Sequence, residues 1–409
     1  ALERGERSGI FRAGEGRPDL TGSPIPRFDL LKLPAYDAMA VQFSRGCPFQ
    51  CEFCDIIVLY GRKPRTKEPE QLLAELDHLY DLGWRGNVFL VDDNFIGNKR
   101  NVKRLLPELQ TWQEHHDFPF ALITEASVDL ASDDELMEQM GACRFERVFL
   151  GIETPDESSL ASAQKRQNTR QPLEEAVDTI TAHGLEVMAG FILGFDGERP
   201  GAGARIVAFV EHTAIPIAML GVLQALPNTA LWHRLSREGR LLELDGDFDQ
   251  GVQTNLLNFR PTRPIEAIGR EFVEGFEALY APATYVERIA RHCLMLGAPR
   301  WRHGRPWWRR DWSGGHHLAE LRGAAAVVMA RGVLTPGALH FWRVLLGLVI
   351  RRPQQLPRFL RLLVIHEHFL DYRLSVRAQV DAQLAWARQR PDVLLPSALA
   401  PSTLAAAPS

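Results

Sequence analysis

Three cysteines stand close together near the amino end of this chain. Cys47, Cys51 and Cys54 form a C-x3-C-x2-C pattern within the sequence FSRGCPFQCEFCD. Cysteine thiolates are the usual protein ligands of iron–sulfur clusters, and most [4Fe–4S] clusters take four of them. Three ligands would leave one iron with an open position where a substrate could bind. The pattern therefore predicts a cluster that takes part in chemistry rather than one that only carries electrons.

Two other interpretations of the cysteines remain open. They could form a zinc site with a fourth ligand from elsewhere, such as His78, or they could be ordinary core thiols. Zinc sites usually contain two closely spaced cysteine pairs, and no second pair follows in this sequence. Cys143 and Cys293 stand alone, so we expect each to be a small buried residue.

The composition is that of an ordinary globular protein. The chain has 409 residues, 45% of them hydrophobic and 24% charged, which predicts two or three domains. The formal net charge of −4 gives no general reason to expect a nucleic-acid partner. No secretory signal precedes the first predicted strand, and no apolar run approaches the ~20 residues that span a bilayer. We therefore expect a cytoplasmic protein without a transmembrane segment.

Short apolar runs alternate with helical stretches over the first 240 residues. Runs that are apolar throughout are typical of parallel strands covered by helices on both faces. The α/β pattern predicts a partial (β/α)6 barrel, with an open doubly wound sheet as the alternative. The predicted strands are Ala38–Ser44, Asn87–Asp92, Phe120–Ala126, Arg147–Glu153, Glu186–Gly194 and Ala218–Leu226.

The second part of the chain has a different character. A loop-like stretch over residues 241–264 precedes segments that are mostly helical, Ile265–His292 and Pro336–Arg388. We therefore divide the chain into four parts: residues 1–35 as a linker, 36–240 as the barrel, 241–390 as a helical domain and 391–409 as a disordered tail.

Polar residues follow two of the predicted strands at their carboxyl ends, where barrel enzymes build their active sites. Asp92, Asp93 and Asn94 come at the end of the second strand, and Glu153 ends the fourth. Carboxylates at these places could bind an ammonium or ribose hydroxyl group. The alternatives are that Asp93 or Asn94 begins the next helix as its N-cap, and that Glu153 forms a salt bridge to a barrel arginine.

Two further segments are candidates for ligand contact. Gly190 and Gly194 in GFILGFDGE would let a flat base approach the fifth strand closely, although glycine in a buried strand is often a packing device. Lys63, Arg65 and Lys67 form a cationic stretch that could face a carboxylate or phosphate, or lie in a solvated loop.

Taken together, these segments resemble a known family. The cysteine pattern, with Phe53 before its last cysteine, resembles the signature of the radical S-adenosylmethionine (SAM) enzymes. Other segments are similar to the cobalamin-binding subgroup, in the branch that includes hopanoid methylases, over roughly residues 20–290. In chain order they are GRKPRTK, VDDNFIGN, VFLGIETPDESSL, KRQNTR, MAGFILGFDGE and QALPNT.

The resemblance implies a fold, a set of cofactors and a reaction. It implies a partial barrel whose [4Fe–4S] cluster is chelated at its open iron by SAM, and reductive cleavage of SAM to a 5′-deoxyadenosyl radical. The family usually has Gly-Gly-Glu where this chain has Asp-Asp-Asn. The implied residues are Cys47, Cys51 and Cys54 for the cluster, Asp92, Asp93, Asn94 and Glu153 for the methionine or ribose end, and Phe53, Gly190, Ile192 and Gly194 for adenine.

The subgroup normally carries a cobalamin domain ahead of its barrel. The D-x-H-x-x-G motif that ligates cobalt is absent, and fewer than 40 residues precede the first predicted strand. Residues 1–35 are similar to the linker between the two family domains. With the Ala1 start, this favours a chain cut from a longer cobalamin-binding protein over one that has lost the domain.

Three functions follow from these observations. The leading one is radical SAM methylation of an unactivated carbon on a hydrophobic small molecule, with cobalamin as methyl carrier and a flavodoxin or ferredoxin as electron donor. The second is a radical cyclisation or rearrangement without methyl transfer, and the third is a non-enzymatic iron–sulfur or zinc protein.

The helical part contains two segments rich in arginine and large apolar residues. Arg300–Trp312 has five arginines and four tryptophans, and Leu345–Val364 mixes apolar residues with arginine. Tryptophan and arginine favour the membrane interface. These segments could contact a membrane surface peripherally or cover a lipidic substrate; the alternative is a helical lid on the barrel.

Overall fold

The computed structural model describes residues 16–242, 254–298, 315–334 and 337–389, together with Gly5, Ser8 and Gly9. Side chains are described in all of these except residues 315–321. The predicted tail over residues 391–409 and the segment Arg300–Trp312 lie outside the described residues.

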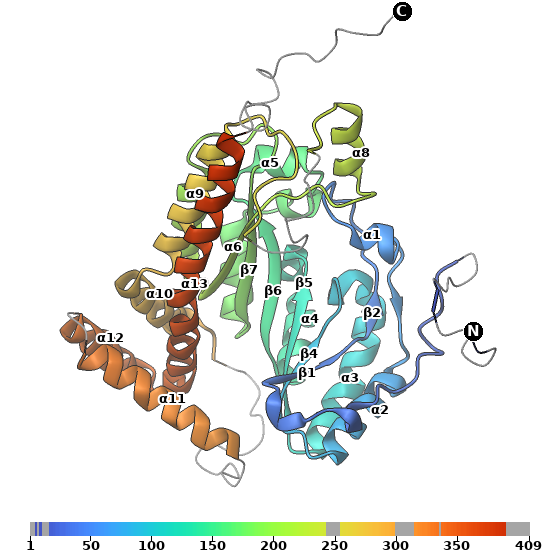
Figure 1. The fold of residues 1–409 in the computed structure, drawn as a ribbon. Coiled ribbons are helices and arrows are strands. Elements are labelled where there is room, and N and C mark those ends of the chain that lie inside the picture. Colours follow the sequence, from blue (N-terminus) through green and yellow to red (C-terminus); the bar gives the residue numbers. More distant parts are fainter. Residues whose placement is uncertain are drawn as a thin grey trace, which may run out of the picture.

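A six-stranded parallel sheet forms the centre of the molecule (Figure 1). Its order is β1-β4-β5-β6-β7-β8, so the strands lie side by side in the order in which they occur along the chain. The strands are β1 (Ala38–Val41), β4 (Gly86–Leu90), β5 (Phe120–Ala126), β6 (Phe145–Glu153), β7 (Glu186–Leu193) and β8 (Ile217–Val222).

This strand order confirms the predicted partial barrel. A doubly wound sheet reverses its direction of winding at a switch point, whereas this sheet winds in one direction and curls into a half-barrel. The predicted run Phe120–Ala126 coincides with β5. The first predicted run, Ala38–Ser44, is divided, because β1 ends at Val41 and a separate short strand begins at Ser44.

Helices cover one face of the sheet and leave the other face partly open. Along β7 the buried residues Val187, Ala189, Phe191 and Leu193 alternate with partly exposed ones, as expected when successive side chains point to opposite faces. The helices between the strands are α2 (Pro69–Asp81), α3 (Lys99–His115), α4 (Asp134–Ala142), α5 (Glu157–Ser162), α6 (Leu173–Ala182) and α7 (Ala202–Thr213).

A two-stranded antiparallel ribbon follows β1. It pairs β2 (Ser44–Arg45) with β3 (Arg65–Thr66), and the short helix α1 (Ile56–Leu59) lies in the connection between them. The cysteine loop is therefore closed at its base by the ribbon. Residues ahead of β1 pack along this part of the barrel, since Leu20 and Phe28 are buried.

The second part of the chain is helical, as predicted. Figure 1 shows α9 and α13 beside the β7–β8 side of the sheet, with α11 and α12 projecting below them. No helix among the described residues is long and apolar enough to cross a membrane. The helices after the sheet are α8 (Ala230–Arg237), α9 (Ile265–Leu279), α10 (Pro282–Met295), α11 (Gly315–Gly332), α12 (Ala338–Arg351) and α13 (Leu356–Arg388).

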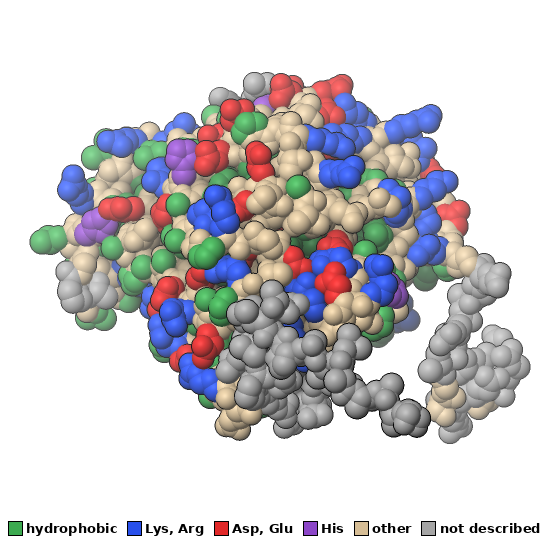
Figure 2. Space-filling model, turned by 90° about the horizontal axis from the view of Figure 1, so that it is seen from above, with side chains coloured by type: hydrophobic (Ala, Val, Ile, Leu, Met, Phe, Trp, Pro, Cys, Tyr) green, Lys and Arg blue, Asp and Glu red, His purple; other side chains and the backbone are tan. Residues whose placement is uncertain are grey.

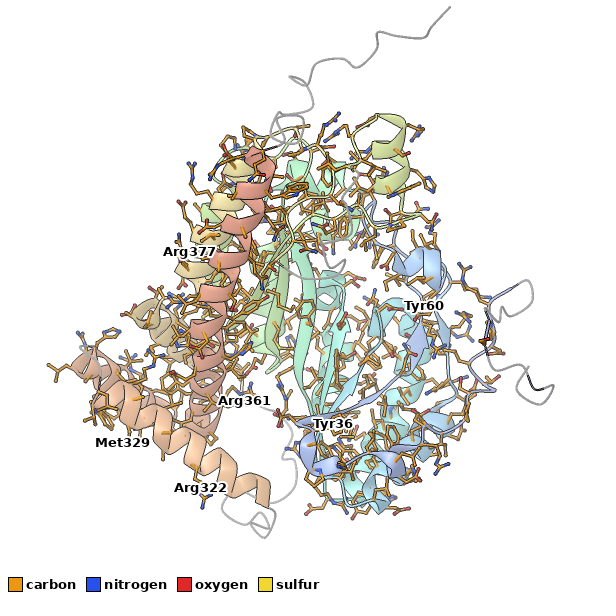
Figure 3. The ribbon with its side chains drawn as sticks, viewed as in Figure 1. Tyr36, Tyr60, Arg322, Met329, Arg361 and Arg377 are labelled. Carbon is orange, nitrogen blue, oxygen red and sulfur yellow. The ribbon has the colours of Figure 1, made fainter. Side chains whose placement is uncertain are left out.

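Buried ion pairs join α13 to the amino end of the sheet. Glu186, the first residue of β7, is fully buried and accepts hydrogen bonds from Arg361 at 2.7 Å and Arg358 at 3.2 Å. Burial opposes ionisation of Glu186, but these arginines outweigh it and lower its pKa. Arg361 is labelled in Figure 3, where α13 passes the lower end of the sheet. This network attaches the helical part to the barrel.

Candidate iron–sulfur and SAM site

The loop that carries the three cysteines has a conformation that requires glycine at its start. Gly46 has a φ of +101°, and a Cβ atom there would lie 2.7 Å from the carbonyl oxygen of Gly61. The adjoining backbone N–H of Cys47 donates to that same oxygen at 3.2 Å. The two ends of the loop therefore approach more closely than any other residue at position 46 would allow.

Asp92 holds this loop against the barrel. Its carboxylate accepts hydrogen bonds from the backbone N–H groups of Phe43 at 2.7 Å and Ser44 at 3.0 Å, and from the Ser44 hydroxyl at 3.1 Å. Burial raises the pKa of Asp92 to about 7. Both of its oxygens are engaged by the chain, so Asp92 positions the loop; direct contact with SAM stays a prediction.

Asp93 and Asn94 lie beside the first cysteine. Asp93 accepts a hydrogen bond from the N–H of Gly46 at 3.0 Å, and the side-chain amide of Asn94 lies 3.8 Å from the Cys47 sulfur. Asn94 occupies the N-cap position of the 3₁₀ helix η4 (Phe95–Asn98), although its side chain makes no capping hydrogen bond, and the N-cap of α3 is Asn98. The N-cap alternative therefore holds for the position of Asn94, while the side chains of both residues lie toward the cluster loop.

Glu153 forms a buried ion pair with Lys165. Its backbone has a φ of +66°, which is uncommon for a residue other than glycine. A Cβ atom on Gly151 would lie 2.6 Å from a Glu153 oxygen and 2.7 Å from the Lys165 nitrogen, so the pair lies directly over that glycine. Glu153 therefore does form a salt bridge, but its partner is Lys165 rather than an arginine of the barrel.

Lys165 and Gln167 are site residues that the sequence predictions did not single out. The Lys165 nitrogen lies 5.8 Å from the centre of the Phe53 ring, and the amide of Gln167 donates to the Cys51 sulfur at 3.4 Å. Burial opposes the charge of Lys165, but Glu153 and Cys51 outweigh it and raise its pKa. Their signal was available in KRQNTR, which follows the carboxyl end of the same strand as Glu153.

A further carboxylate, Glu125, lies near Asp93 on the partly open face. It is the next to last residue of β5, and no cation is paired with it in the described part of the chain. Burial and, to a smaller extent, the charge of Asp93 raise its pKa to about 7. Glu125 was part of a predicted strand but was not predicted as a site residue.

The predicted adenine segment lies close to other parts of the chain. The Phe53 and Phe195 rings meet edge to face, with centroids 5.8 Å apart. A Cβ on Gly190 would lie 3.1 Å from the Phe149 ring, and one on Gly194 would lie 2.9 Å from the Leu257 side chain. Both glycines therefore serve packing. Adenine contact by Phe53, Gly190, Ile192 and Gly194 stays a prediction.

The cationic stretch is largely engaged by protein groups. Lys67 forms a buried ion pair with Glu75, and Arg65 donates to the backbone carbonyls of Pro18 and Tyr60. Lys63 is exposed to solvent. Lys67 is therefore not a free cation for a ligand.

The donor set fits a [4Fe–4S] cluster with three protein ligands. Burial, together with the neighbouring thiols, raises the pKa of Cys54 to about 12, so its thiolate needs a bound cation. Two amide groups point at the sulfurs, as in sites that stabilise an anionic cluster.

The zinc alternative has no support in the described residues. There, no three metal-binding side chains lie close enough to hold a single ion. His78 instead lies against Phe28 and Asp29. Cys143 and Cys293 are fully buried, as expected.

Figure 2 looks at the molecule from the side of α5 and α8, the helices that follow the carboxyl ends of β6 and β8. Acidic and basic side chains both lie on this face. The site residues Asp93, Glu125, Glu153 and the cysteine loop all follow or end strands at this side of the sheet.

Comparison with known proteins agrees with the site. A family model described as "Radical SAM superfamily" matches residues 41–209, and one described as "Domain of unknown function (DUF4070)" matches residues 229–382. The chain is 55% identical over 409 residues to the uncharacterized methyltransferase sll1242 of Synechocystis sp., covering 99% of this chain and 74% of that protein. It is 36% identical over 371 residues to the hopanoid C-2 methylase of Rhodopseudomonas palustris, covering 91% and 68% respectively.

The chain therefore belongs to the radical SAM superfamily and is an enzyme. Within that superfamily it falls in the branch that contains the hopanoid C-2 methylase. Membership implies a [4Fe–4S] cluster and SAM as cofactors, and it leaves no place for a non-enzymatic function. Among solved structures, the cobalamin-dependent SAM radical enzyme OxsB is similar with a TM-score of 0.49 and 14% identity, covering 90% of this chain and 59% of that chain.

Proposed function

We propose that this enzyme methylates an unactivated carbon of a hydrophobic small molecule. The bound cluster would supply an electron to SAM, whose cleavage yields a 5′-deoxyadenosyl radical, and cobalamin would carry the methyl group. The observation that carries the proposal is the loop of three cysteines held at the carboxyl end of a half-barrel, with amide donors at the sulfurs of Cys47 and Cys51.

The residues around the loop have separate tasks in this proposal. Asp92 holds the backbone N–H groups just before Gly46 and Asp93 holds that of Gly46 itself, so the start of the loop keeps one conformation. Lys165 lies near two of the cysteines and offsets negative charge there. Glu125 remains as a carboxylate without a cation partner in the described chain, and it supplies an acceptor for the ammonium group of SAM.

The partly open face of the sheet supports a hydrophobic substrate. Its side chains include Met219, which is 45% exposed, and Val91, which is 36% exposed. Phe149 and Ile192 lie on the same face at partly exposed positions of β6 and β7. When an apolar ligand covers these side chains, no hydrogen bond to water is lost. The burial of both apolar surfaces then contributes favourable hydrophobic free energy to binding.

Two relatives favour methyl transfer. Both proteins described above are named as methyltransferase or methylase, and the second is named for a hopanoid. The cobalamin proposal rests on the motif resemblance to the cobalamin-binding subgroup. A flavodoxin or ferredoxin would supply the electrons.

The test follows the methyl group of SAM. The anaerobically reconstituted enzyme is incubated with methyl-deuterated SAM, hydroxocobalamin, a reductant and a candidate hopanoid. We expect 5′-deoxyadenosine together with a product that carries the labelled methyl group, and no labelled product when hydroxocobalamin is omitted.

Each other outcome identifies a rival. Release of 5′-deoxyadenosine with a changed but unmethylated product would favour a cyclisation or rearrangement. Labelled product in the absence of cobalamin would contradict only the proposal that cobalamin carries the methyl group. Use of reduced flavodoxin in place of a chemical reductant tests the electron donor in the same assay.

A further inference from the structure

The hairpin formed by α11 and α12 exposes many large apolar side chains. In a protein in water such residues are normally scattered, and a contiguous group marks an interaction surface. In this hairpin the exposed fractions are 87% for Leu339, 81% for Ile350, 75% for Leu334, 59% for Val333, 55% for Met329 and Leu346, and 37% for Trp342. Met329 and Arg322 are labelled on α11 in Figure 3.

The exposed residues of α12 form one stripe. Leu339, Trp342, Leu346 and Ile350 follow one another at intervals of three, four and four residues, which places them on the same side of a helix. The opposite side holds Phe341, Leu345 and Leu348, which are buried. The helix is therefore apolar on both sides, although only one side packs against the protein.

The charged residues of the hairpin itself, from Arg322 to Arg351, are all basic. Residues 322–351 contain arginine and histidine but no aspartate or glutamate. Arg331 pairs with Glu367 and His340 with Glu287, on neighbouring helices. In the described part of the chain, Arg322 and Arg343 have no carboxylate partner, and neither has Arg351.

We propose that this surface docks on a lipid bilayer that contains anionic lipids. The docking surface consists of Met329, Val333, Leu334, Leu339, Trp342, Leu346 and Ile350 with Arg322, Arg343 and Arg351. Its apolar side chains enter the interface while the arginines meet the lipid phosphates, and tryptophan favours the same depth. The helices lie on the membrane and do not span it.

Charge favours lipid over a second copy of the chain. A two-fold dimer through this surface would place the same residues from both copies against each other. That arrangement would bring the unpaired Arg343 and Arg351 of the two copies together, whereas Glu320, near the start of α11, is the one acidic residue in the sequence of the two helices. An anionic bilayer supplies the opposite charge.

The inference goes beyond the proposed chemistry, because docking does not depend on methyl transfer. Docking would also bring the enzyme to a hydrophobic substrate, since a lipidic molecule would reach the enzyme from the bilayer on which the hairpin lies. Methylation assays in detergent would remain unaffected by loss of docking, so the two proposals fail separately.

Flotation with lipid vesicles tests the proposal. The full chain with its cluster is mixed with vesicles of phosphatidylcholine alone or with added phosphatidylglycerol. The test variant is Leu346→Glu/Ile350→Glu, and Arg343→Glu/Arg351→Glu probes the charges. Leu30→Glu is the matched control, because Leu30 is 71% exposed on a 3₁₀ turn near the amino end.

We expect the wild-type protein to bind vesicles with phosphatidylglycerol at least about tenfold more tightly than neutral ones, and salt to weaken this binding. Each double variant should lose about tenfold or more, while Leu30→Glu binds as the wild type does. Unchanged far-ultraviolet circular dichroism and iron content exclude misfolding, since the substituted side chains are exposed.

Two results would overturn the proposal. One is binding that the Leu346→Glu/Ile350→Glu variant retains in full. The other is a dimer in light scattering that dissociates in this variant, with no vesicle binding by the wild type, which would make the surface a contact between copies.

Discussion

At the amino end of the sheet, Glu186 lies between Arg358 and Arg361, whereas at the carboxyl end Glu125 has no cation partner in the described chain. Both carboxylates belong to strands of the same sheet. The pKa of Glu186 is lowered because the arginines outweigh the effect of its burial. The pKa of Glu125 is raised to about 7 because no cation offsets its burial.

The difference separates a structural end from a reactive end. At the amino end the buried charge of Glu186 is matched by the arginines on α13, which attach the helical part to the barrel. At the carboxyl end, carboxylates and thiols are gathered with Lys165 as the cation among them. Such an arrangement is costly for an empty protein and favourable once a cationic ligand or cluster is bound.

The largest effect should come from the cluster loop. We expect Cys51→Ala to abolish cluster binding and with it SAM cleavage, because two thiols do not hold a site-differentiated cluster. Iron and sulfide content after anaerobic reconstitution measures this. Cys143→Ala, a change at a fully buried core thiol, should keep the cluster; full SAM cleavage by Cys51→Ala would refute the ligand assignment.

Breaking the matched charges at the amino end should cost stability. Glu186→Gln removes the carboxylate that Arg358 and Arg361 contact and leaves Glu146 to offset their charges in part, and removing one partner of a buried pair costs up to about 3–5 kcal/mol. Denaturant unfolding measures the change in free energy.

Arg377→Gln provides the matched control for this prediction. Its pair with Glu277 is exposed, so its loss should cost about 1 kcal/mol or less. Equal losses for the two variants would contradict the structural role of the amino end.

Replacing Glu125 should raise the stability of the folded protein, whereas replacing Glu186 should lower it. Because its pKa rises from 4.5 to about 7 on folding, the folded protein binds the proton more tightly than the unfolded chain. Stability due to this group is therefore present below pH 4.5 and is lost as the pH rises to about 7. Glu125→Gln should match the wild type in acid and be more stable by about 1–2 kcal/mol above about pH 7.

Thermal unfolding of the cluster-free protein at several pH values measures this gain. Glu157→Gln is the control, because it is the same substitution at an exposed residue of α5. A stability difference between Glu125→Gln and wild type that is independent of pH would show that the carboxyl end is as well matched as the amino end. The same variant should bind SAM more weakly, since the proposed acceptor of its ammonium group is lost.

The smallest effect should come from a single hydrogen bond at the cluster. Gln167→Leu removes the donor to the Cys51 sulfur, and hydrogen bonds to cluster sulfurs raise the reduction potential. We expect a more negative potential with unchanged iron content, measured by redox titration with electron paramagnetic resonance. Gln50→Leu, at an exposed position of the same loop, should leave the potential unchanged.

The strands could be predicted, and the three cysteines proposed as cluster ligands, because their signals are local. The run FALITEA coincides with β5, and the cysteine spacing lies within eight residues of chain. Lys165 and Gln167 could not be placed, because their meaning depends on where η6 (Arg166–Thr169) brings them relative to a loop more than a hundred residues earlier. The stretch GRKPRTK shows the reverse, since two of its apparent free cations, Lys67 and Arg65, are engaged by Glu75 and by backbone carbonyls.

The sequence by itself determined the chemistry, because three thiols at fixed spacing have few uses and the order of strands and helices follows from the pattern of apolar residues. Only the tertiary structure decided which charges are matched. Glu186 and Glu125 are the same residue type in similar strands, and their difference comes from what packs beside them: α13 brings two arginines to one, and the partly open face of the sheet leaves the other alone. Electrostatic energy depends on distances in space, which the order of residues along a chain does not contain.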